Sequence, residues 1–340
     1  MKPEDFDYYL PPELIAQEPP PRRTDSRMMV LDRASGEIFH RSFTHLREYL
    51  RQGDLLIFND TRVIPARLLG RKAGTGGRVE ALLLHPTGSG RWEAMVQPGR
   101  RIKPGHVLEF GDGSLRATVV ESTDDGHRIL QFETDSFWED IHRVGVTPLP
   151  PYIHRDLEDP RRYQTVFARH RGSSAAPTAA LHFDLSILEK LKNLGIRQAH
   201  VTLHIGPGTF QPVKALKLED HVMHREYYRI PPETLEIIKK TKKEGGRVIP
   251  VGTTSTRVME TVFGDGDNPG PLEGWTGIFI YPGYRFKVAD ALITNFHLPR
   301  STLIMMISAF AGREFVLKAY REAVKNQYRF FSFGDCMLIV

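Results

Sequence analysis

The stretch between residues 63 and 150 constrains the fold most. Apolar and polar residues alternate in short runs at 78–84, 92–96, 107–110 and 115–120, and glycine-rich turns at 74–77, 88–90 and 111–113 separate these runs. A period of two is typical of half-buried strands, and several short strands at this spacing favour a closed all-β structure. The stretch therefore predicts a small β-barrel, with a helix only near 135–144.

The rest of the chain alternates between helical and strand patterns. Helices are expected at 183–194, where Asp184 can cap and Gly195 can end the helix, and at 231–243. Further helices are expected after Arg257, at 301–310 and at 313–327. Strands are expected at 28–31, 37–40, 55–58, 200–205, 247–251, 277–281, 291–294 and 336–340. This alternation predicts an α/β domain with a mostly parallel sheet. The domain comprises residues 1–62 and 151–340, interrupted by the β-barrel inserted at 63–150.

Charge is unevenly divided between these parts. The chain has 46 basic and 41 acidic residues, a net charge of +5, whereas 63–150 holds 11 of each. A polyanionic partner is therefore expected to bind mainly to the α/β part. The single cysteine, Cys336, permits no intrachain disulfide and no cysteine-based zinc site. The charged N-terminus and the short apolar run at 303–312 predict a cytoplasmic protein without signal peptide or membrane span.

Gly206-Pro-Gly208 follows an apolar strand, which is one feature of a nucleotide-binding loop. Such loops open a helix whose free N–H groups bind phosphate, and Pro212 disfavours a helix here. A tight turn that exposes its backbone to a ligand and a purely structural turn both remain open. Under the first of these, Gly206 and Gly208 are binding residues.

The segment 252–257, Gly-Thr-Thr-Ser-Thr-Arg, lies between a buried strand and a helix. Ligands of open α/β sheets bind at the carboxyl ends of strands, and hydroxyls with a guanidinium suit a carboxylate, a ribose or a phosphate. An ordinary hydroxyl-capped helix start is the alternative. The predicted binding residues are Thr253, Thr254, Ser255 and Arg257.

Five of the fourteen histidines fall between residues 182 and 224: His182, His200, His204, His221 and His224. His221 and His224, with Glu226 nearby, have a spacing that could ligate a metal. The spacing fixes no third ligand beside the two histidines, so no metal is expected. Acid/base work is the favoured role. Asp60 and Arg62 follow the strand at 55–58 and form either a binding pair or a structural ion pair.

Arg161, Arg162 and Arg169 are interleaved with Tyr163 and Phe167. Arginines mixed with aromatic rings suit contact with both phosphates and bases of RNA. The lysines between 239 and 243 are better explained as a solvated helix face.

Many of these segments resemble the S-adenosylmethionine:tRNA ribosyltransferase-isomerases. The matching blocks follow one another in order along nearly the whole chain, at residues 6–11, 13–17, 53–67, 163–167, 175–183, 203–210, 221–227, 251–255, 274–283, 293–299 and 328–332. Departures are small: Ala180 stands where the family usually has glycine, and Ser174 where it usually has valine. The extra methyl group at Ala180 leaves the role of its loop open.

The resemblance implies an α/β domain with an inserted β-barrel. It also implies a reaction in which the ribosyl part of S-adenosylmethionine, a co-substrate, is transferred to 7-aminomethyl-7-deazaguanine at the wobble position of tRNA and rearranged. Epoxyqueuosine-tRNA, adenine and methionine are the implied products, and a monomer without a metal is expected.

This chemistry requires a base near the acidified C–H beside the sulfonium and a proton donor near the departing adenine. His182, His204 and Asp60 are the candidates by residue chemistry, with Arg161, Arg162 and Arg169 on the tRNA phosphates. Methyl transfer from the same donor and tRNA binding without catalysis are the alternatives.

Overall fold

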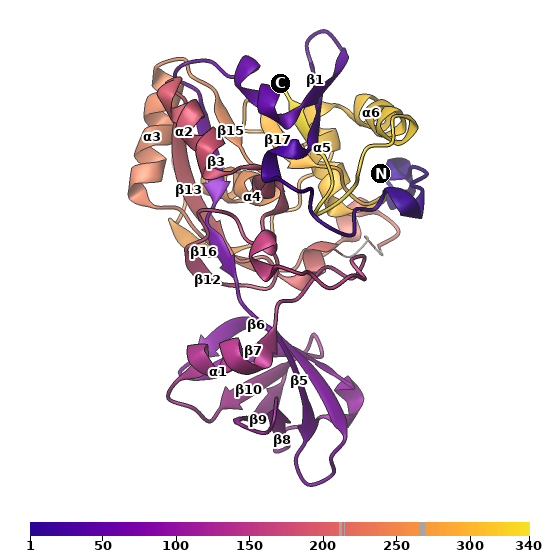
Figure 1. The fold of residues 1–340 in the computed structure, drawn as a ribbon, viewed down its shortest axis with the longest axis vertical. Helices are drawn as coiled ribbons and strands as arrows, with labels where there is room; N and C mark the ends of the chain where they lie inside the picture. Colours follow the sequence, from indigo (N-terminus) through magenta and orange to yellow (C-terminus); the bar gives the residue numbers. More distant parts are fainter. Residues whose placement is uncertain (211–212, 214, 265–268) are drawn as a thin grey trace. The chain divides into compact units, whose positions relative to one another are not determined.

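The computed structural model describes residues 1–210, 213, 215–264 and 269–340. It divides into two compact units (Figure 1). The α/β unit contains Met1–Thr61, Pro150–Arg169 and Pro177–Val340, and the barrel unit contains Arg62–Leu149 and His170–Ala176. The predicted fold class, an α/β part with an inserted β-barrel, is confirmed.

Two mixed sheets form the α/β unit. The first has the order β15-β3-β13-β14-β16, and the second has the order β17-β18-β1-β2. The strands of the first are β15 (Val248–Pro250), β3 (Leu55–Asn59), β13 (Arg197–Leu203), β14 (Glu226–Arg229) and β16 (Glu273–Thr276). Those of the second are β17 (Leu292–Asn295), β18 (Cys336–Ile339), β1 (Arg27–Leu31) and β2 (Ile38–Ser42).

Parallel pairing is less extensive than the sequence predicted. β15 and β13 both run parallel to β3, and β1 runs parallel to β18. The other pairs are antiparallel. β2 returns from β1 through a hairpin, and among the described residues no α-helix separates β14 from β13, whereas parallel neighbours need a longer crossover connection. The strand predicted at 277–281 was also misplaced, since β16 ends at Thr276.

Helices cover these sheets. They are α2 (Leu185–Asn193), α3 (Pro232–Lys243), α4 (Thr253–Val262), α5 (Thr302–Ala311) and α6 (Arg313–Lys325). Asp184 caps α2 by accepting a hydrogen bond from the Ile187 N–H at 2.8 Å, as predicted. None of the helices in the described ranges combines the length and apolar character that a membrane span requires.

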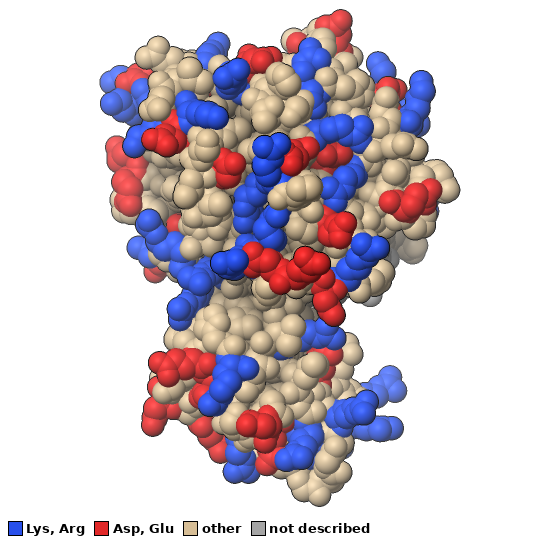
Figure 2. Space-filling model, in the orientation of Figure 1, with Lys and Arg blue, Asp and Glu red and all other residues tan. Residues whose placement is uncertain are grey.

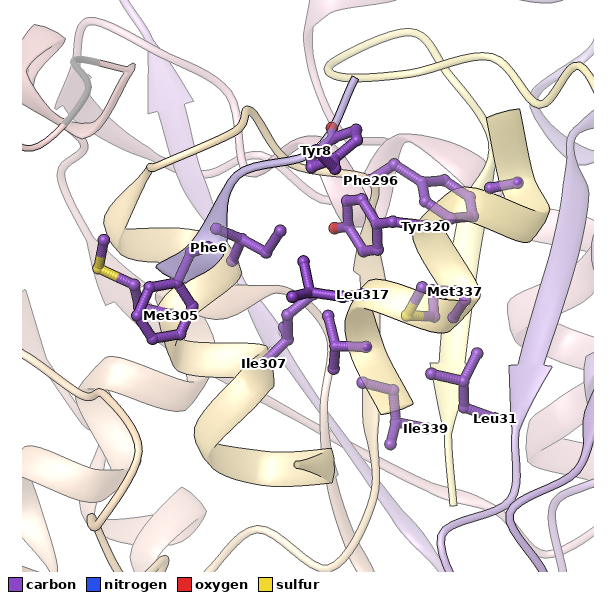
Figure 3. Packing of buried hydrophobic residues seen from close by; sticks show 14 of the residues in the cluster. Phe6, Tyr8, Leu31, Phe296, Met305, Ile307, Leu317, Tyr320, Met337 and Ile339 are labelled. Carbon is purple, nitrogen blue, oxygen red and sulfur yellow. The ribbon is translucent and has the colours of Figure 1, made fainter. Parts of the chain in front are cut away.

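Aromatic rings pack among aliphatic side chains and methionines in the core between α5, α6 and the second sheet (Figure 3). Tyr8 meets Tyr320 edge to face with ring centroids 4.9 Å apart, and Phe296 lies 5.4 Å from the same ring. Such pairs contribute beyond the apolar area that they bury, each by about 0.5–1.5 kcal/mol. This core therefore anchors the N-terminal segment to the C-terminal helices.

The barrel unit is a seven-stranded sheet of order β11-β5-β6-β7-β10-β9-β8, closed by pairing of β5 with β8. Its strands are β5 (Arg67–Lys72), β6 (Arg78–Gly88), β7 (Arg91–Gln97), β8 (Val107–Phe110), β9 (Leu115–Ser122), β10 (Arg128–Phe132) and β11 (Gly145–Val146), with one helix, α1 (Phe137–Val144). Alternate residues fill the interior, as the period of two predicted.

Short elements complete the chain. β4 (Thr61–Val63) pairs with β12 (His170–Ser173). The 3-10 helices are Pro3–Phe6, Pro12–Leu14, Arg23–Asp25, Phe43–Glu48, Gly99–Arg101, Pro160–Tyr163, Thr178–His182, Pro207–Phe210 and Leu218–Asp220.

Candidate active site

One edge of the α/β unit collects the predicted site residues. The parallel strands β15, β3 and β13 all end there, and Gly252, Asp60 and His204 follow them closely in the chain. A parallel bridge between Val251 and Ile293 brings the end of β17, Asn295, to the same edge. Polar loops at the carboxyl ends of parallel strands are where α/β proteins bind ligands.

His204 is held by the loop after β3. A 2.8 Å hydrogen bond joins its Nδ1 to Thr61 Oγ1, and its ring stacks on Tyr227 at 5.6 Å and 26°. Asn59 holds the loop after β3 against the end of β13, because its Oδ1 accepts hydrogen bonds from the N–H groups of Thr61 and Leu203. His204 thus has a defined orientation, with Nε2 on the side of the ring away from Thr61.

Asp60 lies beside this pair and is 5% exposed. Its Oδ1 accepts a hydrogen bond from Thr202 Oγ1 at 2.7 Å, and its carbonyl accepts one from the Arg169 N–H at 2.8 Å. Burial lowers the pKa of the nearby His200, and the Asp60 carboxylate acts in the opposite direction. The Asp60 carboxylate therefore interacts with Thr202 and His200, and Asp60 directly precedes Thr61, the partner of His204.

A buried ion pair lies behind the glycine turn. Glu226 and Arg257 are 4% and 2% exposed, and Glu226 Oε2 accepts a hydrogen bond from Arg257 Nη1. Glu226 Oε1 accepts from the Gly206 N–H at 2.9 Å and from Thr209 Oγ1 at 2.8 Å. Glu226 thus organises the turn, so these contacts do not support the alternative in which it ligates a metal with His221 and His224.

Gly208 lies close to the exposed side chain of His224. A Cβ atom built at Gly208 would lie 2.2 Å from the His224 ring, so any other residue here would require that ring to move. The turn continues as the 3-10 helix Pro207–Phe210 rather than an α-helix, as expected for a loop other than the dinucleotide type. Pro212, on which part of that expectation rested, lies outside the described residues.

The hydroxyls at the start of α4 divide into two groups. Ser255 Oγ donates to the Val251 carbonyl at 3.0 Å and Thr256 Oγ1 to the Gly252 carbonyl at 3.1 Å, so both serve the helix itself. Within the described ranges, Thr254 Oγ1 and the Nε and Nη2 atoms of Arg257 are buried without a hydrogen-bond partner. Residues three apart share a helix face, so these three polar atoms belong to one face of α4.

His182 lies farther along the edge and is 3% exposed. Asn295 Nδ2 donates to the Phe331 carbonyl at 2.8 Å, so its Oδ1 accepts from His182 Nε2 at 3.0 Å. His182 Nδ1 then accepts from Ser26 Oγ at 2.8 Å. Burial lowers the pKa of His182, which favours the neutral ring. His182 is bonded to Asn295 at the end of β17, and His204 follows β13. Three strand spacings of about 4.8 Å separate these two strands, so the two histidines lie too far apart to act on the same atom.

The predicted tRNA-binding arginines differ in their surroundings. The Arg161 side chain is 90% exposed and donates to Asp159 Oδ1 at 2.8 Å. Arg162 donates to the carbonyls of Pro20 and Pro21, which ties it to the N-terminal segment, whereas Arg169 is exposed. Figure 2 shows basic side chains gathered in the middle of the α/β unit's visible face.

Comparisons with known proteins agree with this architecture. The family model described as "Queuosine biosynthesis protein" matches residues 3–339. A protein of Acetivibrio thermocellus named S-adenosylmethionine:tRNA ribosyltransferase-isomerase is 56% identical over 340 residues, and one of Caldanaerobacter subterraneus subsp. tengcongensis with the same name is 52% identical over 341; each match covers both chains fully. The crystal structure of the S-adenosylmethionine tRNA ribosyltransferase of Thermotoga maritima is 40% identical, with a TM-score of 0.57, and the match covers 99% of this chain and 100% of that chain.

Proposed function

Because the chain belongs to the queuosine biosynthesis family, as an enzyme of the S-adenosylmethionine:tRNA ribosyltransferase-isomerase type, we propose its specific reaction. It transfers the ribosyl group of S-adenosylmethionine to 7-aminomethyl-7-deazaguanine at the wobble position of tRNA and isomerises it. Epoxyqueuosine-tRNA, adenine and methionine are the proposed products. The proposed working form is a monomer in the cytoplasm, where tRNA is modified.

The unpartnered polar atoms on α4 carry the proposal for the donor site. Buried N–H and O–H groups without partners are rare in native proteins, since each costs about 1–3 kcal/mol. Nε and Nη2 of Arg257 form the side of the guanidinium that binds a carboxylate through two hydrogen bonds. We assign this side, with Thr254 Oγ1, to the carboxylate of the methionine moiety.

The buried Glu226 balances the charge of this site. It neutralises Arg257 in the absence of substrate, and it keeps the N–H of Gly206 in place. The donor brings its own positive sulfonium and ammonium groups, so a carboxylate can approach Arg257 without leaving a net negative charge buried. Thr253 and Ser255 shape the start of α4, and Gly206 and Gly208 line the adjoining turn.

His204 and Asp60 are the proposed proton-transfer residues. Thr61 orients the His204 ring through Nδ1, and the oriented imidazole is proposed to exchange a proton with the donor or the departing adenine. Asp60 is placed to influence the protonation of this cluster. Both ring nitrogens of His182 are hydrogen-bonded, to Ser26 and to Asn295. We therefore propose that His182 contributes by holding these two side chains in place.

Product analysis tests the reaction. The protein is incubated with S-adenosylmethionine and tRNA carrying the aminomethyl-deazaguanine base, and the nucleosides and small molecules are identified by mass. Free adenine and epoxyqueuosine are expected. S-adenosylhomocysteine would instead indicate methyl transfer, and tRNA binding without turnover would indicate a binding module; either result would refute the proposal.

Donor binding tests the site. Calorimetry compares S-adenosylmethionine with its decarboxylated analogue in the wild type and in Arg257→Lys, which keeps the charge but loses the two-pronged geometry. The wild type should prefer the carboxylate form by about tenfold or more, given 1.5–3 kcal/mol for a hydrogen bond to a charged group. Equal preferences in the two proteins would place the carboxylate elsewhere.

A further inference from the structure

Three rings lie in a row across neighbouring strands at the active-site edge. His204 follows β13, Tyr227 lies in β14 and Trp275 lies in β16. The His204 N–H donates to the Tyr227 carbonyl at 3.0 Å, and Tyr227 is the register partner of Trp275. Residues directly opposite each other on paired strands face the same side of the sheet, so the three rings share one face.

The rings are in contact with one another. Their centroids are 5.6 Å apart for His204 and Tyr227 and 6.0 Å apart for Tyr227 and Trp275. Tyr227 is held in place because its hydroxyl donates to Glu273 Oε2 at 3.1 Å. The aromatic row is the name used below for His204, Tyr227 and Trp275.

The two faces of this sheet differ. Tyr228 is 3% exposed and points to the opposite face, where it packs over Gly274. Trp275 is 39% exposed, and His204 and Tyr227 are half-buried. Exposed on the same side, two residues along β14, is Arg229. One exposed tryptophan is ordinary, but a continuous row that begins at the proposed proton-transfer histidine and has a cation beside it is not.

We propose that the aromatic row stacks unpaired bases of the tRNA anticodon loop that flank the modified base. This inference rests on the proposed function and adds the surface that receives the loop. Single-stranded RNA is recognised by stacking on aromatic and histidine rings, with arginines on the phosphates. The row extends two strand spacings of about 4.8 Å from β13, which leaves room for bases beyond the reacting one.

The test measures binding of an anticodon stem-loop RNA, by fluorescence anisotropy at fixed salt, to full-length Trp275→Ala, Trp275→Phe and wild-type protein. Stacking of one base on an aromatic ring changes affinity by roughly 5- to 150-fold. Trp275→Ala should therefore bind the RNA at least about fivefold more weakly, and Trp275→Phe should restore most of the affinity. S-adenosylmethionine affinity, measured by calorimetry, should be unchanged in both.

A matched control comes from the barrel unit. Trp138 is 37% exposed, nearly the same as Trp275, and its replacement by alanine should leave RNA affinity unchanged. RNA binding by Trp275→Ala at wild-type strength would overturn the proposal. A joint loss of RNA binding, donor binding and thermal stability would also overturn it, because the residue would then be structural. Failure of the proposed function itself would appear separately, as wild-type protein that yields no adenine.

Discussion

The two units bury polar groups very differently. Among the described residues, the buried polar side chains of the barrel unit are Arg128, Ser173 and Ser174, while the α/β unit buries Asp54, Asn59, Asp60, His182, Glu226, Arg257, Glu260, Asn295, His297 and many hydroxyls. Burying such groups costs free energy unless each is paired. The barrel interior is an ordinary apolar core, whereas the α/β unit accepts this cost at several places, one of which is the edge proposed to bind substrate.

The contrast extends to how the buried cations are satisfied. Arg128 Nε and its two Nη atoms donate to the carbonyls of Ile102, Gly126, His127 and Gly99. Arg257 has one partner, Glu226, and keeps two unpartnered nitrogens among the described residues. A fully bonded arginine stabilises a fold, and a partly bonded one is available for a ligand. Comparing a substitution in the α/β unit with an equivalent one in the barrel unit can therefore separate effects on stability from effects on function.

The largest expected effect is on turnover. Replacing His204 by alanine should lower the catalytic rate by about 10²–10⁴-fold, since it removes a general acid or base. His127 in the barrel, which shares a 2.6 Å hydrogen bond with Glu93, provides the control, and its alanine variant should turn over normally. Steady-state assays of adenine release compare the two. Full activity in the His204 variant would remove this residue from the mechanism.

Next comes stability. Arg257→Met should lower the free energy of unfolding of the α/β unit by about 3–5 kcal/mol, because it leaves the Glu226 charge buried and unpaired. Arg128→Met should cost the barrel unit less, about 1–3 kcal/mol, because it leaves only neutral carbonyls. Urea unfolding measures both, and Glu226→Gln added to Arg257→Met should recover part of the loss. Equal losses in the two units would contradict the comparison.

The pH dependence should also differ between the units. Burial lowers the pKa of His297 to about 3, whereas an unfolded histidine titrates near 6.5. The unfolded chain therefore binds more protons below this value, and stability present above pH 6.5 is lost as the pH falls toward 3, by up to about 1.4 kcal/mol per pH unit.

Urea midpoints between pH 7 and 5 measure this slope. The pKa values of His182 and His200 are lowered by burial as well, so the α/β unit, which also holds the buried His297, should lose stability faster than the barrel. In the barrel, lowered pKa values belong to the half-buried His85 and the exposed His142. A His297→Gln variant should show a shallower dependence. Parallel slopes for both units would show that these buried histidines do not set the acid sensitivity.

The smallest effect is expected for exposed arginines. Arg161→Gln should leave the stability nearly unchanged, because its ion pair with Asp159 is solvated. Its affinity for anticodon stem-loop RNA should show a salt dependence reduced by about one phosphate contact. Arg71→Gln in the barrel, which breaks an exposed pair with Glu109, should leave the salt dependence unchanged.

Local patterns explain why the sequence predicted much of the fold. The barrel strands follow from apolar alternation and glycine turns, and α2 follows from its cap and its apolar face. Both are properties of neighbouring residues. The extended segment at 277–281 was misassigned because its apolar residues Phe279 and Tyr281 pack against the core without pairing in a sheet. Apolar burial alone does not distinguish these two arrangements.

The site was less predictable because its contacts join distant segments. His204 was named from its chemistry, but its partner Thr61 and the bracing Asn59 lie some 140 residues earlier in the chain. Glu226 suggested a metal ligand by spacing, and only the fold pairs it with Arg257. Polar residues at the end of an otherwise apolar strand and just after it, as Asn59 and Thr61 are at β3, were the signal available.

The inserted barrel has a consequence for synthesis on the ribosome. Met28 in β1 pairs with Cys336 in β18, so the second sheet of the α/β unit cannot close until the chain has been made almost to residue 340. Most of the barrel, from Arg62 to Leu149, is contiguous and emerges much earlier. Nascent protein should therefore carry a folded middle while its N-terminal segment waits with its apolar strands uncovered, a stage at which chaperones would bind.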